Sequence, residues 1–308
     1  MNNQYKQSIL VIDYLVVVLI LLIDLSSARG QYKESISDFY DYANAAWIES
    51  TVLHEHTSVV NNWGIHWDKI IDKSIEILSS DSTYTLDENH AHTLIQLQNF
   101  YKSAIEFGSE KEKVQLVQKH YPMLLGILFS KITVPESKAK QVNEVIEYLK
   151  IAYREKIENS NNIGKYYKDL FLKKLETMEF EVGAPSLSDF PQIPKLSADS
   201  LESNIQLSNI FRPEMDNVKS DWNTPPFETD CYYNFHDNKV KIYAGILYDP
   251  NITVEADFVY LFATLGRTIS HEMTHAFDNI GMNYDQNGEY INWFEKLFSG
   301  ALFSKNDL

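Results

Sequence analysis

The hydrophobic positions between about Phe39 and Met215 recur at intervals of three and four residues, the period of an α-helix with one buried face. The first such stripe comprises Trp63, Trp67, Ile70, Ile71, Ile75 and Ile77. The following stripes comprise Leu94, Leu97, Tyr101 and Ile105; Val114, Leu116, Val117 and Tyr121; and Val142, Val145, Ile146, Leu149 and Tyr153. No Gly-rich or Pro-rich linker interrupts them, so the pattern predicts helices that pack against one another.

The pattern changes after a stretch between Phe211 and Pro226 in which prolines accumulate. Residues 240–243 alternate and are rich in β-branched and aromatic side chains, which predicts a short strand. A helical run then opens at Thr253, and its apolar face comprises Phe258, Leu261, Phe262, Leu265 and Ile269. We therefore expect a mainly α fold, with a helical N-terminal lobe over residues 29–215 and a second lobe with a short β element over residues 216–308.

The first 28 residues have the features of a targeting segment. Lys6 precedes an apolar stretch from Ile9 to Leu25, and the small residues Ser26 to Ala28 suit cleavage by signal peptidase. Asp13 and Asp24 shorten the uninterrupted apolar run to ten residues, whereas a membrane helix needs about 20. The segment predicts a cleaved signal peptide and secretion; the alternative is a retained anchor that holds a type II protein in the plasma membrane.

Composition narrows the possible partners. The chain of 308 residues has 27 Lys and Arg against 43 Asp and Glu, a formal net charge of −16, which argues against binding the phosphate backbone of a nucleic acid. Its single cysteine, Cys231, has no partner for an internal disulfide, and we expect it to be buried as a small apolar side chain. Nothing in the sequence indicates the oligomeric state.

The candidate chemistry lies on the helical run that follows the strand. The segment His271-Glu272-Met273-Thr274-His275 is an HExxH motif, in which residues four apart project from one side of a helix. Two imidazoles in this arrangement can bind one Zn²⁺, and Glu272 on an adjacent side can reach a metal-bound water without being a ligand. Such a site hydrolyses peptides, because the metal acidifies the water and polarises the carbonyl while the carboxylate transfers the proton.

Three ordered blocks of the chain resemble the neprilysin, or M13, family of zinc peptidases. They are Asp38 to Trp47; Trp222 to Pro226 with Asp230 to Asn234 and Ala244 to Leu247; and His271 to Asp278 with Gly281, Asp285, Gly288 and Trp293. The resemblance implies a zincin catalytic lobe of the gluzincin type, with one Zn²⁺ per chain. It makes His271 and His275 zinc ligands and Glu272 the catalytic base. Asp230, Cys231 and Tyr232 become the counterparts of the Asn-Ala-aromatic stretch that holds the substrate backbone.

The chain departs from the family pattern at two kinds of position. Asp230 stands where the family has Asn, and a carboxylate accepts hydrogen bonds but donates none; Cys231 stands where the family has Ala. The family's third zinc ligand is a Glu within a later Glu-x-x-x-Asp motif, and neither Glu289 nor Glu295 is followed by Asp four residues on. We therefore expect the catalytic lobe to be partial in this chain, with the third ligand absent.

These features favour a zinc metalloendopeptidase that hydrolyses extracellular peptides. The alternative is a catalytically inactive secreted homologue that binds peptides or protein partners without cutting them. Either protein would meet a membrane only through the possible N-terminal anchor.

Overall fold

The computed structural model describes residues 62–80, 84–218, 220, 222, 224–249, 252 and 258–291. Internal contacts divide the chain into two units, residues 1–65 and 66–308, and every contact discussed below lies within the second. Some of the predicted features lie outside the described residues: the targeting segment, the block from Asp38 to Trp47, and the residues Asn223, Thr253 and Trp293. Within the described ranges, no helix combines the length and apolar character needed to cross a bilayer.

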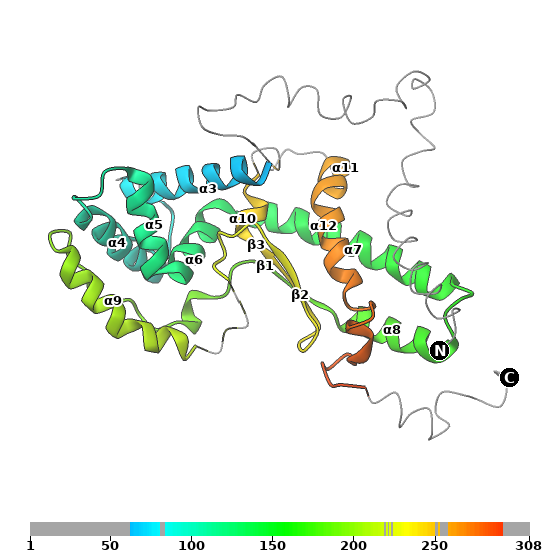
Figure 1. Cartoon of the computed structure of the whole chain (residues 1–308). Helices are drawn as coiled ribbons and strands as arrows, with labels where there is room; N and C mark the ends of the chain where they lie inside the picture. Colours follow the sequence, from blue (N-terminus) through cyan, green and yellow to red (C-terminus); the bar gives the residue numbers. More distant parts are fainter. Residues whose placement is uncertain are drawn as a thin grey trace, which may run out of the picture. The chain divides into compact units, whose positions relative to one another are not determined.

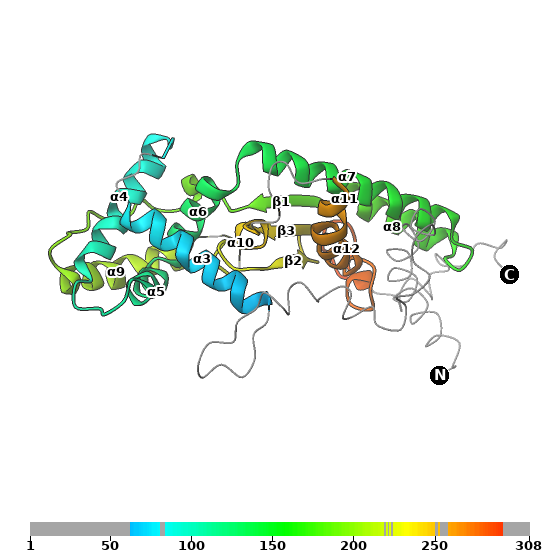
Figure 2. The ribbon, with the colours of Figure 1, turned by 90° about the horizontal axis from the view of Figure 1, so that it is seen from above.

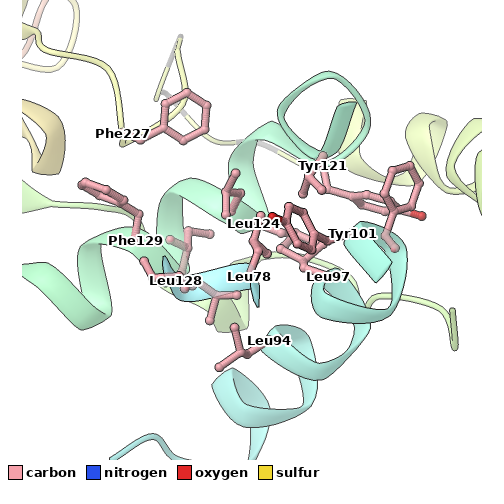
Figure 3. Packing of buried hydrophobic residues seen from close by; sticks show 14 of the residues in the cluster. Leu78, Leu94, Leu97, Tyr101, Tyr121, Leu124, Leu128, Phe129 and Phe227 are labelled. Carbon is pink, nitrogen blue, oxygen red and sulfur yellow. The ribbon is translucent and has the colours of Figure 1, made fainter. Parts of the chain in front are cut away.

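One group of helices encloses a first hydrophobic cluster (Figures 1 and 3). The group consists of α3 (Asn62–Ser79), α4 (Glu88–Ser103), α5 (Glu110–His120), α6 (Pro122–Thr133) and α9 (Leu201–Asp216). The predicted stripes supply its core, because Leu94, Leu97, Tyr101, Val117 and Tyr121 are all buried. Figure 3 shows the side chains of this cluster gathered between the helices.

One residue of the predicted stripes was placed wrongly. Ile105 is 77% exposed, because α4 ends at Ser103 and Ala104 caps it, which takes Ile105 into the turn that follows. The next helix begins at a strong local signal: Ser109 and Glu112 form a capping box that satisfies the free N–H groups of the first turn of α5.

A second hydrophobic cluster joins α7 (Glu136–Asn159) and α8 (Lys165–Thr177) to a small sheet. The predicted stripe of Val142, Val145, Ile146 and Leu149 on α7 is buried here, against side chains of the sheet and of the helix that bears the HExxH motif. Figure 2 shows α7 alongside β1 and α12 next to β2.

The sheet has the order β1-β3-β2, with β1 (Glu179–Gly183) parallel and β2 (Cys231–Asn234) antiparallel to β3 (Lys239–Tyr243). Strand β3 confirms the predicted strand, whereas β1 lies in the lobe that we expected to be helical. The predicted boundary between residues 215 and 216 stays a prediction; β1 comes before it in the chain and pairs with β3, which comes after it.

The remaining elements are short. They are η2 (Leu187–Asp189), α10 (Ala244–Leu247), α11 (Phe258–Leu261), the π-helical turn η3 (Phe262–Gly266), α12 (Arg267–Thr274) and η4 (Gly281–Asn283). The mainly α fold with a small β element is thus confirmed.

Candidate metal centre

The HExxH motif lies at the end of a continuous helical segment made of α11, η3 and α12. Its apolar side chains Leu265, Ile269 and Met273 are buried in the second cluster, and α12 contacts β2 and β3. His271 lies within α12, whereas His275 is its C-cap residue, with helical backbone angles of φ −60° and ψ −21°. Because His275 keeps helical geometry, the two imidazoles still project from the same side, with ring centroids 4.9 Å apart.

Three side chains of this motif meet closely enough to hold a metal ion. The potential ligand atoms of His271, Glu272 and His275 all lie within 4.8 Å of one another, and no other such group occurs in the described part of the chain. Burial lowers the pKa of His271, and electrostatic repulsion from His275 and Arg267 lowers it further. The lowered pKa favours the neutral imidazole, which is the form that binds metals. Imidazole nitrogens are ligands that fit Zn²⁺, and the carboxylate of Glu272 lies beside the two rings.

Asp278 orients the imidazole of His275. Its Oδ2 lies 2.8 Å from Nδ1 of His275, and its Oδ1 accepts hydrogen bonds of 2.8 Å from the backbone N–H groups of Ile280 and Gly281. Burial alone would raise the pKa of Asp278, but these hydrogen bonds lower it below its usual value. With the carboxylate ionised, Nδ1 of His275 carries the proton and Nε2 is left to bind a metal.

Gly281 closes this turn against the end of the motif. A Cβ atom at Gly281 would lie far inside van der Waals contact with the carbonyl oxygen of His275. Because glycine has no Cβ atom, it lets the backbone of the turn approach α12 this closely.

Glu272 faces the edge strand of the sheet. Its Oε2 accepts a hydrogen bond of 3.2 Å from the backbone N–H of Tyr233 on β2. Burial raises the pKa of Glu272, although His275 and the Tyr233 N–H oppose the shift. A carboxylate with a raised pKa, largely withdrawn from water, is well suited to accept a proton and return it.

The residues expected to bind substrate lie at and beside β2. Tyr232 lines a cavity of about 220 Å³, whose described lining is otherwise formed by Tyr233, Phe235, Glu272, His275, Asp278, Ile280 and Gly281. Of the three expected residues, all described, Asp230 and Cys231 do not contribute to that lining. Asp230 accepts a hydrogen bond of 2.8 Å from the N–H of Cys231, and Cys231 is buried, as expected. Burial raises the pKa of the Cys231 thiol, and the nearby carboxylates of Glu272 and Asp230 raise it further.

Sequence reasoning assigned no role to Asp278, although the signal was present. The aspartate follows His275 at a spacing of three residues, which brings it to the same side of a helical turn. Tyr233 was likewise without a role, because its contribution is a backbone N–H, which no side-chain motif reveals.

Known proteins share sequence with the part of the chain that holds this site. Residues 230–302, which hold the strands β2 and β3 and the HExxH motif, match the family model described as peptidase family M13. The chain is also 28% identical over 195 residues to endothelin-converting enzyme-like 1 of Mus musculus. Over these residues the chain is similar to neprilysin-type peptidases of family M13.

Further similar proteins come from distant organisms. Neprilysin-1 of Trittame loki is 24% identical over 287 residues, which cover 80% of this chain and 40% of the relative. For neutral endopeptidase of Lactococcus lactis the identity is 23% over 197 residues, or 61% of this chain and 31% of the relative. The match to the mouse protein covers 57% of this chain and 24% of the relative. The chain thus spans about a quarter to two-fifths of the length of these relatives.

A solved structure shares the fold. The zinc metalloprotease ZMP1 of Mycobacterium tuberculosis, in its open state, superposes with a TM-score of 0.51 at 24% identity, over 62% of this chain and 31% of that chain. The resemblance is to zinc metalloendopeptidases, and the matched family implies zinc as the cofactor.

Proposed function

We propose that this chain supplies the zinc-binding helix and substrate strand of an endopeptidase that hydrolyses extracellular peptides. The observation that carries the proposal is the meeting of His271, His275 and Glu272 within 4.8 Å, next to the edge strand β2. His271 and His275 would hold the metal. When bound, zinc supplies a Lewis acid that polarises a carbonyl and makes water more acidic.

The chain's own residues would move the proton. Glu272 has a raised pKa and lies beside both imidazoles, so it is placed to accept a proton from the attacking water and to pass it to the leaving amine. Asp278 would keep His275 in the tautomer that leaves Nε2 available.

Strand β2 would bind the peptide as an added strand. It lies at the edge of the sheet, and an edge strand offers backbone N–H and C=O groups to an extended peptide. The N–H of Cys231 donates to Asp230 and that of Tyr233 donates to Glu272, so both of these donors are held by carboxylates. A peptide that pairs with β2 would displace these two contacts, and Tyr232 would contact its side chains from the lining of the cavity.

Secretion, or attachment to the plasma membrane by an N-terminal anchor, is part of the same proposal. It rests on the apolar segment before Ala28 and on the sequence similarity to neprilysin-1 and endothelin-converting enzyme-like 1. The helical lobe of residues 29–215 and the catalytic lobe of residues 216–308 are proposed as its domains.

The test combines metal binding and turnover in one purified sample. We expect one zinc per chain, loss of that zinc in His271→Ala, and hydrolysis of a generic peptide that Glu272→Gln abolishes while zinc stays bound. Zinc that His271→Ala does not remove would overturn the proposed metal centre. Zinc binding that depends on His271, without turnover, would instead favour the inactive homologue that binds peptides.

A further inference from the structure

One of the helices that form the second hydrophobic cluster carries a buried lysine. Lys174 on α8 is 1% exposed, and burying an ammonium group is costly unless hydrogen bonds compensate for the lost water. Burial lowers the pKa of Lys174 to about 8, against the opposing influence of Asp285 and Asp278. A methionine would fill the same space without that cost, so the contacts of the ammonium group need to be considered.

The ammonium group of Lys174 holds the turn that follows the HExxH motif. Its Nζ donates hydrogen bonds of 2.7 Å to the carbonyl oxygen of Gly281 and 3.0 Å to that of Tyr284. The N–H of the same Gly281 donates to Asp278, which binds Nδ1 of His275. Gly281 is therefore held on one side by Lys174 and on the other by the carboxylate that orients a proposed zinc ligand.

The backbone of Lys174 reaches the other side of the site. Its carbonyl oxygen accepts a hydrogen bond of 2.9 Å from Nδ2 of Asn238, a buried residue with a left-handed backbone at φ 52°. The hydroxyl of Tyr233 donates to Oδ1 of this Asn238 at 2.9 Å, and the N–H of Tyr233 donates to Glu272. The Nζ atom of Lys174 also lies 5.9 Å from the centre of the Tyr233 ring.

We propose that Lys174 is a positioning residue of the metal centre, which fixes the turn bearing Asp278 relative to the strand that contacts Glu272. The proposal rests on the proposed function, since it assumes that His271 and His275 bind zinc. Lys174 would not touch metal or substrate. It would act through Gly281 and Asp278 on the orientation of His275, and through Asn238 and Tyr233 on that of Glu272.

The chain offers a matched control in a second buried lysine. Lys138 on α7 is 8% exposed, and its Nζ donates a hydrogen bond of 2.9 Å to the carbonyl oxygen of Leu247 on α10. The pKa of Lys138 is also lowered by burial. Lys138→Met therefore removes the same kind of contact, but its partner is not part of the turn after the motif.

The test measures zinc affinity of the 308-residue chain by competition with a chromophoric chelator, and the visible absorption spectrum of the Co²⁺-loaded protein. We expect Lys174→Met to weaken zinc binding about tenfold and to change the cobalt spectrum, because altering a residue that orients a ligand typically costs 10-fold to 100-fold in metal affinity. Lys138→Met should leave affinity within about twofold of the wild type, and its cobalt spectrum unchanged. Should Lys174→Met be insoluble, Lys174→Gln, which keeps one donor group, should show a smaller loss in the same direction.

The outcomes separate this inference from the function on which it rests. Wild-type affinity and an unchanged cobalt spectrum in Lys174→Met, with His271→Ala abolishing binding, would overturn the positioning role alone. An equal loss in Lys138→Met would overturn it as well, because the effect would then be general destabilisation. If the wild type binds no zinc that depends on His271, the proposed function and the positioning role both fail.

Discussion

The hydroxyl of Tyr153 fixes the last turn of α12 to α7, and its removal is a sensitive test of the packing behind the metal centre. Tyr153 donates a hydrogen bond of 2.8 Å to the carbonyl oxygen of Ser270, and its hydroxyl lies 3.2 Å from Oγ of Ser270 and 2.7 Å from Oγ1 of Thr274. Ser270 and Thr274 each come directly before a proposed zinc ligand. Tyr153→Phe removes only the oxygen and keeps the ring, which packs 5.9 Å from that of Phe277.

The expected loss in the free energy of unfolding follows from how many hydrogen bonds one hydroxyl group can make. A hydroxyl carries one hydrogen, so Tyr153 cannot donate to both the Ser270 carbonyl and Thr274 at once. Oγ1 of Thr274 also donates to the Ser270 carbonyl at 2.9 Å, so this acceptor keeps a partner in the variant. About two hydrogen bonds disappear, at roughly 0.5–1.5 kcal/mol each, and we expect a loss of about 1–3 kcal/mol in the free energy of unfolding.

Urea denaturation of the wild type and of Tyr153→Phe, followed by circular dichroism, measures this difference in the free energy of unfolding. In thermal unfolding, the Tm of the variant should be lower by about 2–4 °C for each kcal/mol of free energy lost. The control is Tyr148→Phe on the same helix, where the tyrosine is 58% exposed and a change below about 0.5 kcal/mol is expected. Equal effects of the two substitutions, or a loss below about 0.5 kcal/mol in Tyr153→Phe, would refute the account of the buried hydroxyl.

Two further predictions concern the turn after the motif. The pKa of Lys174 is about 8 in the folded protein and 10.5 in the unfolded chain, so the unfolded chain binds more protons between pH 8 and pH 10.5. In that range Lys174 makes the free energy of unfolding rise with pH, by at most about 1.4 kcal/mol per pH unit. The unfolding free energy of the wild type minus that of Lys174→Met should therefore increase from pH 8 to pH 10 in urea titrations; a constant difference would contradict the buried ammonium. Gly281→Ala forces a Cβ onto the carbonyl of His275 and should cost about 3 kcal/mol, whereas Gly108→Ala meets only Glu112 Oε2 at 3.6 Å and should be nearly neutral in the same assay.

The helices were predictable from the sequence because their information is local. The stripe of Leu94, Leu97 and Tyr101 marks a buried face whatever that face meets. The exposure of Ile105 shows the limit of this reasoning, since periodicity alone does not say at which turn a helix stops.

Strand β1 shows a second limit. Glu179 to Gly183 alternates charged and apolar residues, which is a strand signal, but five residues between helical stripes are too few to outweigh their surroundings. What makes the segment a strand is pairing with β3, a contact between distant parts of the chain that local pattern does not contain.

The metal centre was predictable in part for the same reason. His271, Glu272 and His275 were identified because their spacing has a geometric meaning on one helix. Lys174 and Asn238 could not be found in this way, because a lysine on a helix and an asparagine in a hairpin turn are ordinary surface residues until the fold buries them.

The parallel pairing of β1 with β3 also has a consequence for synthesis of the chain on the ribosome. Glu179 pairs with Lys239, so β1 is made roughly 60 residues before its partner. At about 5–20 residues per second, the strand waits on the order of 3–12 s with its backbone groups unpaired. During that interval it can pair with strands of other nascent chains, so crowding of translating ribosomes would lower the yield of folded protein even when the finished fold is stable.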